Sequence, residues 1–538
     1  MISSFTAAHI QDAERAVMAT VKPGALMAKA SFAAATIILR HLRARRGKAA
    51  GARVLLLVGT GNNGGDTLFA GAHLAGRGVA VTAVASGNRV HDEGRAALEA
   101  AGGRLVTLTE GGPGLYMPIE QVAELAPGVD AIVDGLLGIG SRGPLSGHAA
   151  GLVTTLTVEA GLAAPLPYRK AERPFVVAID LPSGVGVDDG SVHGPVLPAD
   201  LTVTFGAYKP AGLLPPASGL FGEIELVDIG LGESLRQASL RPAALRCEPA
   251  DALDLWPLPR RYDHKYTRGV LGVVAGSETY PGAAVLTASA AVRCGVGMVR
   301  YLGPDKAVER VLSRQPEVVP GGGRVDAWAL GPGVAPGAAD QMSRIERALK
   351  WAKGERVPTV LDAGGFAQLP PAPTMLDRWI ILTPHAGELA TLLTDRGIPT
   401  ERAAVEDQPA YYARLAAELV GGTVLLKGPA TVVAGQDGSL YVQADGTPWM
   451  ATAGTGDVLT GIIGALLAGH GDSVAIVPEL PAQLAALGAM VHGRAAVRAA
   501  KECGQVGENA GPGGLGKPIS AMDLVRALPL TIAELLGR

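Results

Sequence analysis

The chain has 538 residues, and 47 Lys and Arg against 50 Asp and Glu give it a formal net charge of −3 at pH 7. That length favours two or more domains, since one domain usually has about 100 to 200 residues. The mixed, near-neutral charge excludes the basic surface that a nucleic-acid backbone or an anionic membrane would require. The 74 glycines follow no triplet period, which excludes a collagen-like chain and fits a glycine-rich α/β enzyme.

The same sequence indicates where the protein resides. No apolar stretch reaches the roughly 18 to 20 residues of a membrane span, and the longest candidate, 458–469, stops at His470. Asp12, Glu14 and Arg15 stand where a signal peptide would have its apolar core. Three distant cysteines form neither a disulfide framework nor a zinc cluster. We therefore expect a cytoplasmic protein that binds neither membranes nor nucleic acid.

Apolar runs that end in glycine open two halves of the chain. RVLLLVG at 53–59 and VLGVVAG at 270–276 have the composition of parallel strands that are buried on both faces. This alternation of strands with helices predicts an α/β fold class with two doubly wound domains. Further strands are predicted at 131–133, 175–179 and 201–205, and at 359–361, 379–382 and 423–426.

The strand and helix rhythm is interrupted between 232 and 261, where four prolines accumulate beside charged residues. We place an N-terminal domain at 1–240, a linker at 241–262 and a C-terminal domain at 263–538. The glycine-rich stretch 504–516 follows no predicted strand, so we expect a surface loop there. A final helix is expected from Ser520.

The run GTGNNGGDT at 59–67 follows the first strand and precedes a helical pattern near Leu68. Such a turn aims backbone N–H groups at a phosphate, and the helix N-terminus adds a partial positive charge. The order differs from the dinucleotide motif GxGxxG, because Asn62 and Asn63 occupy its middle and Asp66 adds an acid. An ordinary Gly-Asn turn is the alternative.

Two later loops place an aspartate at the carboxyl end of a predicted strand. They are DGLLGIGSRGP at 134–144 and AIDLPSGVGVDDG at 178–190. A single aspartate there is as readily a helix cap. Ligands bind at this end of parallel sheets, so the convergence of Asp134, Asp180 and the 59–67 turn predicts a site.

These motifs, in this order, resemble the N-terminal domain of the bifunctional NAD(P)H-hydrate repair enzymes, as do the leader segments AHIQDAERAV and LMAKA. The resemblance implies a Rossmann-like three-layer αβα domain with NAD(P)H-hydrate epimerase activity and a catalytic Asp180. Thr67 stands where the family commonly has glycine, a change that we expect the loop to tolerate. The resemblance also implies potassium (K+) held by Asn63, Asp134 and Ser183, and substrate contacts at Asn62, Asn63, Gly64, Gly65, Asp66, Gly138, Ile139, Gly140, Ser141, Arg142, Gly143, Pro144 and Asp180.

The strongest local signal is MATAGTGDVLTGIIGALLAG at 450–469. Gly454, Thr455 and Gly456 turn the chain into a helix, so free N–H groups and the helix dipole converge beside Asp457. An anion hole next to a carboxylate suits phosphoryl transfer, in which donors stabilise the transferring group and a base deprotonates the attacking hydroxyl. Alternatively, Asp457 only stabilises the first helical turn.

Supporting motifs follow other predicted strands: GPG at 331–333, TPHAGE at 383–388 and KGPA at 427–430. His385 is either a ligand contact or a buried histidine, and Lys427 either reaches a phosphate or is solvated. The residues alone leave both alternatives open. In the family that the next paragraph names, a second acidic or polar residue often follows an Asp-Ala pair. The segment 360–369 contains Asp362 and Ala363 but lacks that second residue, which leaves the role of Asp362 open.

With these companions, GTGD resembles the ribokinase-like superfamily, and HKYTRG at 264–269 with AGSETYPGAA at 275–284 resembles its ADP-dependent NAD(P)H-hydrate dehydratases. The resemblance implies a ribokinase-like αβα domain with a catalytic Asp457. Ala453 replaces a frequent glycine before GTGD. The implied contacts of the hydrated nucleotide are Ala283, Gly333, His385 and Asp457, and those of ADP are Lys427, Gly428, Pro429, Ala430, Thr431 and Gly456.

The two resemblances imply an isomerase and a lyase on one chain that repairs hydrated NADH and NADPH. Water adds across C5=C6 of reduced nicotinamide to give R and S 6-hydroxy forms. In epimerisation the ring nitrogen expels the C6 oxygen and water returns, with Asp180 moving the proton. In dehydration ADP phosphorylates the C6 hydroxyl of the S form with Asp457 as base, and loss of phosphate restores the dinucleotide. ADP, K+ and magnesium (Mg2+) are the expected cofactors, and a homo-oligomer is expected.

Two rival functions stay open on the sequence. The first is a small-molecule kinase fused to a nucleotide-binding domain, against which the NNGGD half and HKYTRG argue. The second is an N-terminal half that serves as a non-enzymatic binding module, against which the presence of Asp180 argues.

Overall fold

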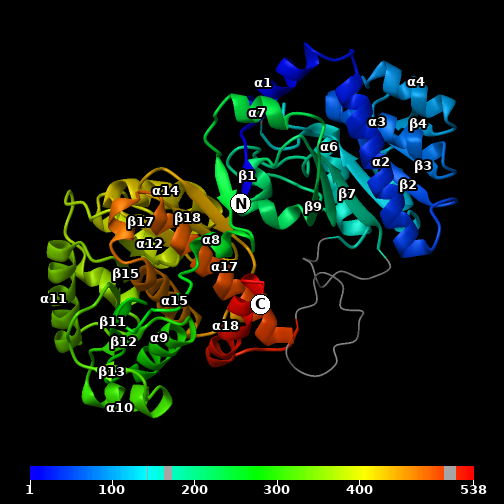
Figure 1. The fold of residues 1–538 in the computed structure, drawn as a ribbon. Helices are drawn as coiled ribbons and strands as arrows, with labels where there is room; N and C mark the ends of the chain where they lie inside the picture. The colour runs from blue at the N-terminus through cyan, green and yellow to red at the C-terminus, as the bar shows by residue number, and fades with distance from the viewer. Residues whose placement is uncertain (142, 163–172, 502–515, 538) are drawn as a thin grey trace. The chain divides into compact units, whose positions relative to one another are not determined.

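A computed structural model describes residues 1–141, 143–162, 173–501 and 516–537 of the chain (Figure 1). The chain separates into two compact units, Ser3–Ala243 and Ala244–Arg538, with Met1–Ile2 belonging to the second. Helices and strands alternate in both units, as the sequence predicts. The predicted α/β class with two doubly wound domains is confirmed.

The unit Ser3–Ala243 contains an eight-stranded sheet in the order β5-β4-β3-β2-β6-β7-β8-β9, and all its neighbouring strands are parallel. Its strands are β2 (Arg53–Val58), β3 (Ala80–Ala85), β4 (Arg104–Thr107), β5 (Leu115–Tyr116), β6 (Ala131–Gly135), β7 (Phe175–Ile179), β8 (Leu201–Phe205) and β9 (Glu223–Val227). The chain runs from β2 outwards to β5 and then returns to the other side of β2. Ligands bind where the strand order reverses in this way, which here is between β2 and β6.

Both faces of this sheet are covered. Leu56 and Val58 join a core with α2 and α3, whereas Leu55 and Leu57 join a second core with α5 and α6. This double burial explains why the 53–59 run is apolar throughout. The helices of this unit are α1 (Ala7–Met18), α2 (Ala25–Arg46), α3 (Asn62–Ala75), α4 (Asp92–Ala100), α5 (Ile119–Leu125), α6 (Gly147–Glu159) and α7 (Gly232–Gln237).

Within the described residues, α2 is the single helix whose length and composition would allow it to cross a membrane. Ala34, Ile38 and Leu42 lie on one stripe of α2 and are at most 1% exposed, in the core beneath the sheet. Burial of that stripe accounts for the apolar composition of the helix.

The strands of the second unit lie in an eleven-stranded sheet in the order β1-β10-β19-β18-β17-β16-β15-β14-β11-β12-β13, in which only Ile2 of the edge strand β1 is assigned to that unit. β18 is antiparallel to β17 and β19, whereas the strands from β17 to β13 are parallel to one another. The strands are β1 (Ile2–Ser4), β10 (Ala244–Arg246), β11 (Val270–Val274), β12 (Met298–Tyr301), β13 (Val319–Pro320), β14 (Ala327–Leu330), β15 (Thr359–Leu361), β16 (Ile380–Leu382), β17 (Thr423–Leu426), β18 (Thr431–Ala434) and β19 (Leu440–Gln443).

One large core joins this sheet to α9, α15, α17 and α18. In α15, residues 458–468 are all buried, which explains the uniformly apolar stretch after GTGD. The helices are α8 (Asp251–Leu255), α9 (Pro281–Arg293), α10 (Asp305–Arg314), α11 (Ala339–Glu355), α12 (Ala386–Asp395), α13 (Arg402–Asp407), α14 (Pro409–Val420), α15 (Thr455–His470), α16 (Ser473–Ile476), α17 (Leu480–Lys501) and α18 (Ala521–Leu535).

The structure corrects the expected linker at 241–262. β10 pairs with β19 through Leu245 and Tyr441, and Trp256, which follows α8, is only 8% exposed. These residues therefore form part of the second unit, because the prolines of this stretch lie at the ends of short elements rather than inside them.

Three further expectations concern a helix start, a loop and the final helix, and their outcomes differ. The helix after the 59–67 turn begins at Asn62 rather than near Leu68, so NNGGD lies within the helix. The loop expected at 504–516 lies outside the described residues except for Gly516. The final helix is confirmed, with Ser520 as its N-cap.

Candidate active sites

The glycine turn after β2 brings three backbone segments close together. A Cβ on Gly64 would lie 2.1 Å from the Gly59 carbonyl oxygen, and a Cβ on Gly59 would lie 1.8 Å from that of Leu136. Only glycine permits this approach. The N-cap of α3 is Gly61, which offers no side chain to the N–H groups of the first turn. Those groups are therefore open to an anion.

Asn63, Asp134 and Ser183 lie in one hydrogen-bonded cluster between β2 and β6. Ser183 donates to both oxygens of Asp134, from its Oγ at 2.7 Å and from its N–H at 2.8 Å. Asn63 Nδ2 donates to the carbonyls of Leu137 (2.8 Å) and Ile179 (3.1 Å). The Leu137 N–H in turn donates to Ser183 Oγ (2.9 Å). The structure thus brings the three residues together.

Asp134 is completely buried in this cluster. Burial raises its pKa above the ordinary value, and the hydrogen bonds from Ser183 and Leu136 oppose that rise. The side chains and carbonyls of the cluster supply carboxylate, hydroxyl, amide and carbonyl oxygens, the donors that hard cations take. The cluster therefore suits a cation that compensates the buried carboxylate.

Asp180 follows β7 with a φ of 72°, an uncommon conformation for a residue other than glycine. Lys209 Nζ donates to Asp180 Oδ1, and Thr204 Oγ1 (3.3 Å) and the Phe205 N–H (3.4 Å) donate to the same oxygen. The Lys209 side chain is only 2% exposed. The sequence analysis did not identify Lys209. Lys209 lies four residues after the end of β8, and Asp180 was identified because it likewise follows the end of a strand.

Two further carboxyl groups interact electrostatically with Asp180. Burial, Asp180 and Glu14 raise the pKa of Asp66 well above its usual value. Asp66 Oδ1 is buried and has no hydrogen-bond partner among the described residues. Burial and Asp180 also raise the pKa of Glu14, which lies on α1, whereas Lys209 lowers it. Glu14 is a second residue that sequence reasoning did not assign to the site.

The loop after β6 closes on itself. Ser141 donates to the Gly138 carbonyl from its Oγ (2.8 Å) and from its N–H (3.0 Å). Ile139 packs against the core beside the sheet, and Gly143 has a φ of 79°. A Cβ built on Gly138 would lie 3.1 Å from the Cβ of Asn63, so the loop borders the cluster. Arg142 lies outside the described residues.

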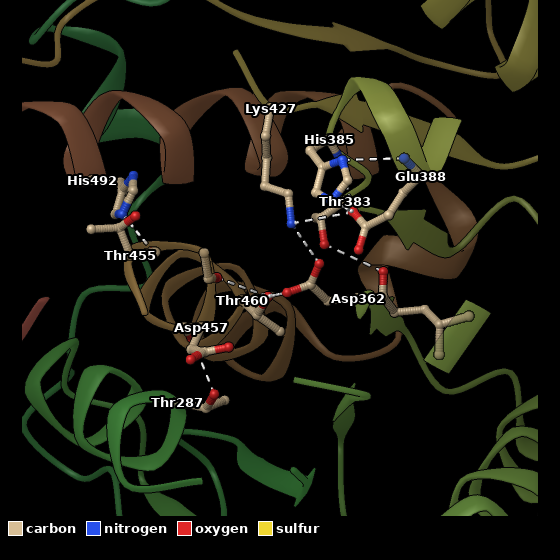
Figure 2. Close-up of polar contacts among 12 residues, drawn as sticks. Thr287, Asp362, Thr383, His385, Glu388, Lys427, Thr455, Asp457, Thr460 and His492 are labelled. Atoms are coloured by element: carbon tan, nitrogen blue, oxygen red, sulfur yellow. Dashed lines mark hydrogen bonds and ion pairs between the residues drawn. The ribbon is translucent and has the colours of Figure 1, made fainter. Parts of the chain in front are cut away.

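In the second unit, the residues that follow four neighbouring parallel strands lie at one edge of the sheet. Figure 2 shows Asp362, His385 and Lys427, which follow three of these strands. His385 and Lys427 pair as a parallel bridge, and the Lys427 N–H donates to the Pro384 carbonyl (2.8 Å). Strand order therefore brings the TPHAGE and KGPA motifs together. The motifs at these ends are GPG after β14, Asp362 after β15, TPHAGE after β16 and KGPA after β17.

Lys427 points towards Asp362, with an Nζ to Oδ1 distance of 2.7 Å (Figure 2). Thr460 Oγ1, from α15, donates to the other carboxylate oxygen of Asp362 (3.0 Å). Burial opposes the charge of Lys427, but Asp362 and Glu388 together raise its pKa. Asp362, whose role the sequence left open, therefore holds both Lys427 and the first turns of α15.

Asp457 lies in the first turn of α15, three residues after Gly454, whose φ is 93°. Burial and the charge of Asp362 raise its pKa to about 7, against a lowering by Lys427. A Cβ on Gly456 would lie 3.5 Å from Lys427 Nζ. The structure thus brings together a carboxylate that titrates near neutral pH, a lysine ammonium and an uncapped helix N-terminus.

Two histidines support this site. His385 caps α12: its Nδ1 accepts from the Glu388 N–H (3.1 Å), and its own N–H donates to Glu388 Oε2 (2.8 Å). Its side chain is 59% exposed, so the alternative of a buried histidine is wrong. His492, from α17, makes a 2.9 Å hydrogen bond to the Thr455 carbonyl, and burial lowers its pKa to about 4. A neutral His492 donates this bond and fixes the GTGD turn. It was missed because α17 is distant in sequence.

The remaining predicted residues border the same edge. A Cβ on Gly333 would lie 2.3 Å from the Cβ of Ala283, and Ser277 Oγ donates to the Gly333 carbonyl (3.0 Å). Gly428, Pro429 and Ala430 connect β17 to β18, which begins at Thr431. Among the described residues, no group of three or more His, Cys, Asp or Glu side chains could hold a metal ion.

Comparisons with known proteins cover both units. Residues 23–211 match the family model described as the YjeF-related protein N-terminus, and residues 271–510 match the model for NAD(P)H-hydrate dehydratase. A solved structure of the ADP/ATP-dependent NAD(P)H-hydrate dehydratase from Bacillus subtilis is 25% identical, with a TM-score of 0.44, over 54% of this chain and 99% of that one.

Curated relatives match nearly the whole chain. The bifunctional NAD(P)H-hydrate repair enzyme Nnr of Mycobacterium leprae is 38% identical over 541 residues, which is 99% of each chain. The enzyme of the same name from Mycobacterium tuberculosis is 40% identical over 468 residues, covering 85% of this chain and 88% of that one. The chain therefore belongs to the family of bifunctional NAD(P)H-hydrate repair enzymes.

Proposed function

We propose that this chain repairs hydrated NADH and NADPH with two active sites. The unit Ser3–Ala243 interconverts the R and S forms, and the unit Ala244–Arg538 dehydrates the S form at the expense of ADP. The observation that carries the proposal is Asp457, which titrates near neutral pH at the open N-terminus of α15, beside Lys427. That is the arrangement that a phosphoryl transfer to a hydroxyl requires.

In dehydration, Asp457 accepts the proton of the C6 hydroxyl as its oxygen attacks the terminal phosphoryl of ADP. The N–H groups of the GTGD turn hold the transferring phosphoryl, because Gly454 leaves the helix N-terminus uncapped. Lys427, kept protonated by Asp362 and Glu388, adds a positive charge. The transfer leaves AMP, and loss of phosphate from C6 together with a proton from C5, which passes to solvent, then restores the C5=C6 bond. Magnesium would neutralise the phosphates of the nucleotide, and its ligands would come largely from those phosphates.

In epimerisation, Asp180 moves the proton of the C6 oxygen. Its place beside β7 and its ion pair with Lys209 put a buried carboxylate beside the open N-terminus of α3, where a nucleotide phosphate would bind. Potassium would be held by Asn63, Asp134 and Ser183, and would compensate the buried charge of Asp134 and stiffen the loop after β6. The cytoplasmic location and the homo-oligomeric state stay predictions from the sequence.

A coupled assay tests both activities in the full chain. A mixture of R and S hydrated NADH is incubated with the protein, ADP and Mg2+, and the absorbance of the regenerated dihydropyridine is followed. Complete recovery of both forms is expected. Recovery of only the S share would leave the N-terminal unit as a binding module, and turnover of ADP with no recovery of NADH would favour the fused kinase.

A further inference from the structure

Among the described residues of the N-terminal unit, three acids and one buried base interact through their charges. Asp66, Asp180 and Glu14 interact through their charges, and Lys209 interacts with Asp180 and Glu14. Three carboxylates and one ammonium would leave an excess of negative charge in a buried place. Burial and the mutual repulsion of the acids therefore raise the pKa of Asp66 and of Glu14 and favour their protonated forms.

Asp180 is surrounded by hydrogen-bond donors. Lys209, Thr204 and Phe205 all donate to its Oδ1, and an acceptor of several donors is a carboxylate. Its Oδ2 has no hydrogen bond in the part of the chain that the structure describes, so this oxygen is free to take a proton from a ligand.

Asp66 has the opposite surroundings. Asp66 is half-buried near the start of α3, its buried Oδ1 has no hydrogen-bond partner among the described residues, and no described cation pairs with it. The neighbouring charges of Asp180 and Glu14 both disfavour its ionisation. The surroundings of Asp66 therefore favour its protonated form, whose hydroxyl has a proton to give. Two carboxyls whose surroundings favour opposite protonation states divide the roles of acid and base between them.

We propose that Asp66 is the general acid and Asp180 the general base of epimerisation, which extends the proposed function of this unit. Asp66 gives its proton to the C6 oxygen, the C6–O bond breaks, and the departing oxygen leaves as water. The lone pair of the ring nitrogen forms the C=N bond of the iminium ion. A water molecule then attacks C6 from the other face, and Asp180 accepts its proton.

The reaction exchanges one water molecule for another and needs no oxidant or reductant. The forward step leaves Asp66 ionised and Asp180 protonated, and exchange of one proton with solvent restores the starting state. In the reverse direction Asp180 is the acid and Asp66 the base, as microscopic reversibility requires. Lys209 is a positioning residue: it donates to Oδ1 of Asp180, and Oδ2 has no hydrogen bond among the described residues.

The test uses the full chain with Asp457→Asn, so that no substrate is lost to dehydration. Pure S hydrate is incubated in water enriched in oxygen-18, and the R form is followed by chromatography and mass spectrometry. One labelled oxygen per inversion is expected, above the spontaneous rate measured without protein. Retention of the original oxygen would mean that the ring opens between N1 and C6, and would overturn the proposal.

Asp66→Asn in the same background is the decisive variant. Loss of the acid should lower kcat by about 10² to 10⁴ while nucleotide binding is kept, because the amide preserves the shape but carries no transferable proton. Asp12→Asn is the matched control: it changes an exposed acid of α1 and should epimerise at the unmodified rate. A rate for Asp66→Asn within about threefold of the unmodified rate would overturn the assignment.

The pH profile gives a readout that does not depend on the variant folding. The unmodified rate should fall at alkaline pH as Asp66 loses its proton, and the residual activity of Asp66→Asn should lack this fall. An unmodified rate that stays level at alkaline pH would contradict the proposal. If the unmodified protein shows no epimerisation at any pH, the proposed function itself fails, which is a different outcome from normal epimerisation by Asp66→Asn.

Discussion

Lys209 donates a hydrogen bond to Asp180 inside the N-terminal unit, and neither side chain is more than 10% exposed. Lys209 also donates to Thr204 Oγ1 (2.9 Å) and to the Phe205 carbonyl (2.9 Å), so its three protons are all used. The ion pair thus ties the end of β7 to the end of β8 at the site proposed for epimerisation.

Lys209→Met should therefore destabilise the unit as well as stop epimerisation. Removing one partner of a buried pair typically costs about 3 to 5 kcal/mol, because the other charge stays buried without compensation. Urea unfolding of the full chain measures the change. The double variant Asp180→Asn with Lys209→Met should regain most of the lost free energy without regaining activity. Equal destabilisation of single and double variants would show that packing, rather than charge, is responsible.

Asp457→Asn should abolish ADP-driven dehydration and at the same time stabilise the C-terminal unit above neutral pH. General-base loss costs about 10² to 10⁴ in rate. A carboxyl with a folded pKa of about 7 is stabilising only when protonated, so its contribution is lost as pH rises from about 4 through 7. The amide avoids that loss, worth up to about 4 kcal/mol at pH 8.

Thermal unfolding of this variant at pH 5 and pH 8 checks the sign, since the gain should be clearly larger at the higher pH. Glu406→Gln is the control: Glu406 is an exposed acid paired with Arg402, and its loss should change stability by less than about 0.5 kcal/mol. A gain at pH 5 as large as that at pH 8 would argue against ionisation of Asp457 as the cause.

The rate of dehydration should rise with pH through about 7. Asp457 must be ionised to accept the hydroxyl proton, and burial together with Asp362 raises its pKa to about 7. The measurement is kcat/KM for the S hydrate between pH 5 and pH 9 with ADP saturating. A rate that is unchanged between pH 5 and pH 8 would exclude Asp457 as the base.

Gly135→Ala should destabilise the N-terminal unit by about 1 to 3 kcal/mol. A Cβ at Gly135 would lie 1.8 Å from Thr67 Oγ1, which itself donates to the Asn63 carbonyl (2.8 Å). Thr67, the departure from the family pattern, thus occupies space that Gly135 leaves open. Adding Thr67→Gly to the Gly135→Ala variant should recover part of the lost stability, as measured by urea unfolding. If the stability losses of the two single variants simply add in the double variant, the two positions are not coupled.

A fragment that begins at Ala244 should fold and dehydrate the S form, whereas one that begins at Tyr262 should be markedly less stable. The shorter fragment lacks β10, which pairs with β19, and the buried Ala252 and Trp256. Urea unfolding and turnover of S hydrate compare the two. Equal stability of the two fragments would support the original assignment of 241–262 as a linker.

Strand positions were predictable because burial on both faces leaves a continuous apolar signal. The runs at 175–179, 201–205, 359–361 and 423–426 are strands with those same bounds. The short strand at 244–246 was missed, since three residues between prolines resemble a loop in every local respect. Its partner β19 lies almost 200 residues later, so only the assembled sheet identifies it.

The sequence by itself determined the two α/β halves, the family, and the polar residues at strand ends, because glycine turns and apolar runs are local features. Only the tertiary structure decided how those residues are charged. Three arrangements depend on which strands are neighbours: Lys209 beside Asp180, the Oδ1 of Asp66 without a hydrogen-bond partner in the described part of the chain, and Lys427 near both Asp362 and Asp457. Protonation depends on burial and on charges brought together across the sheet, and neither is encoded in the spacing of residues along the chain.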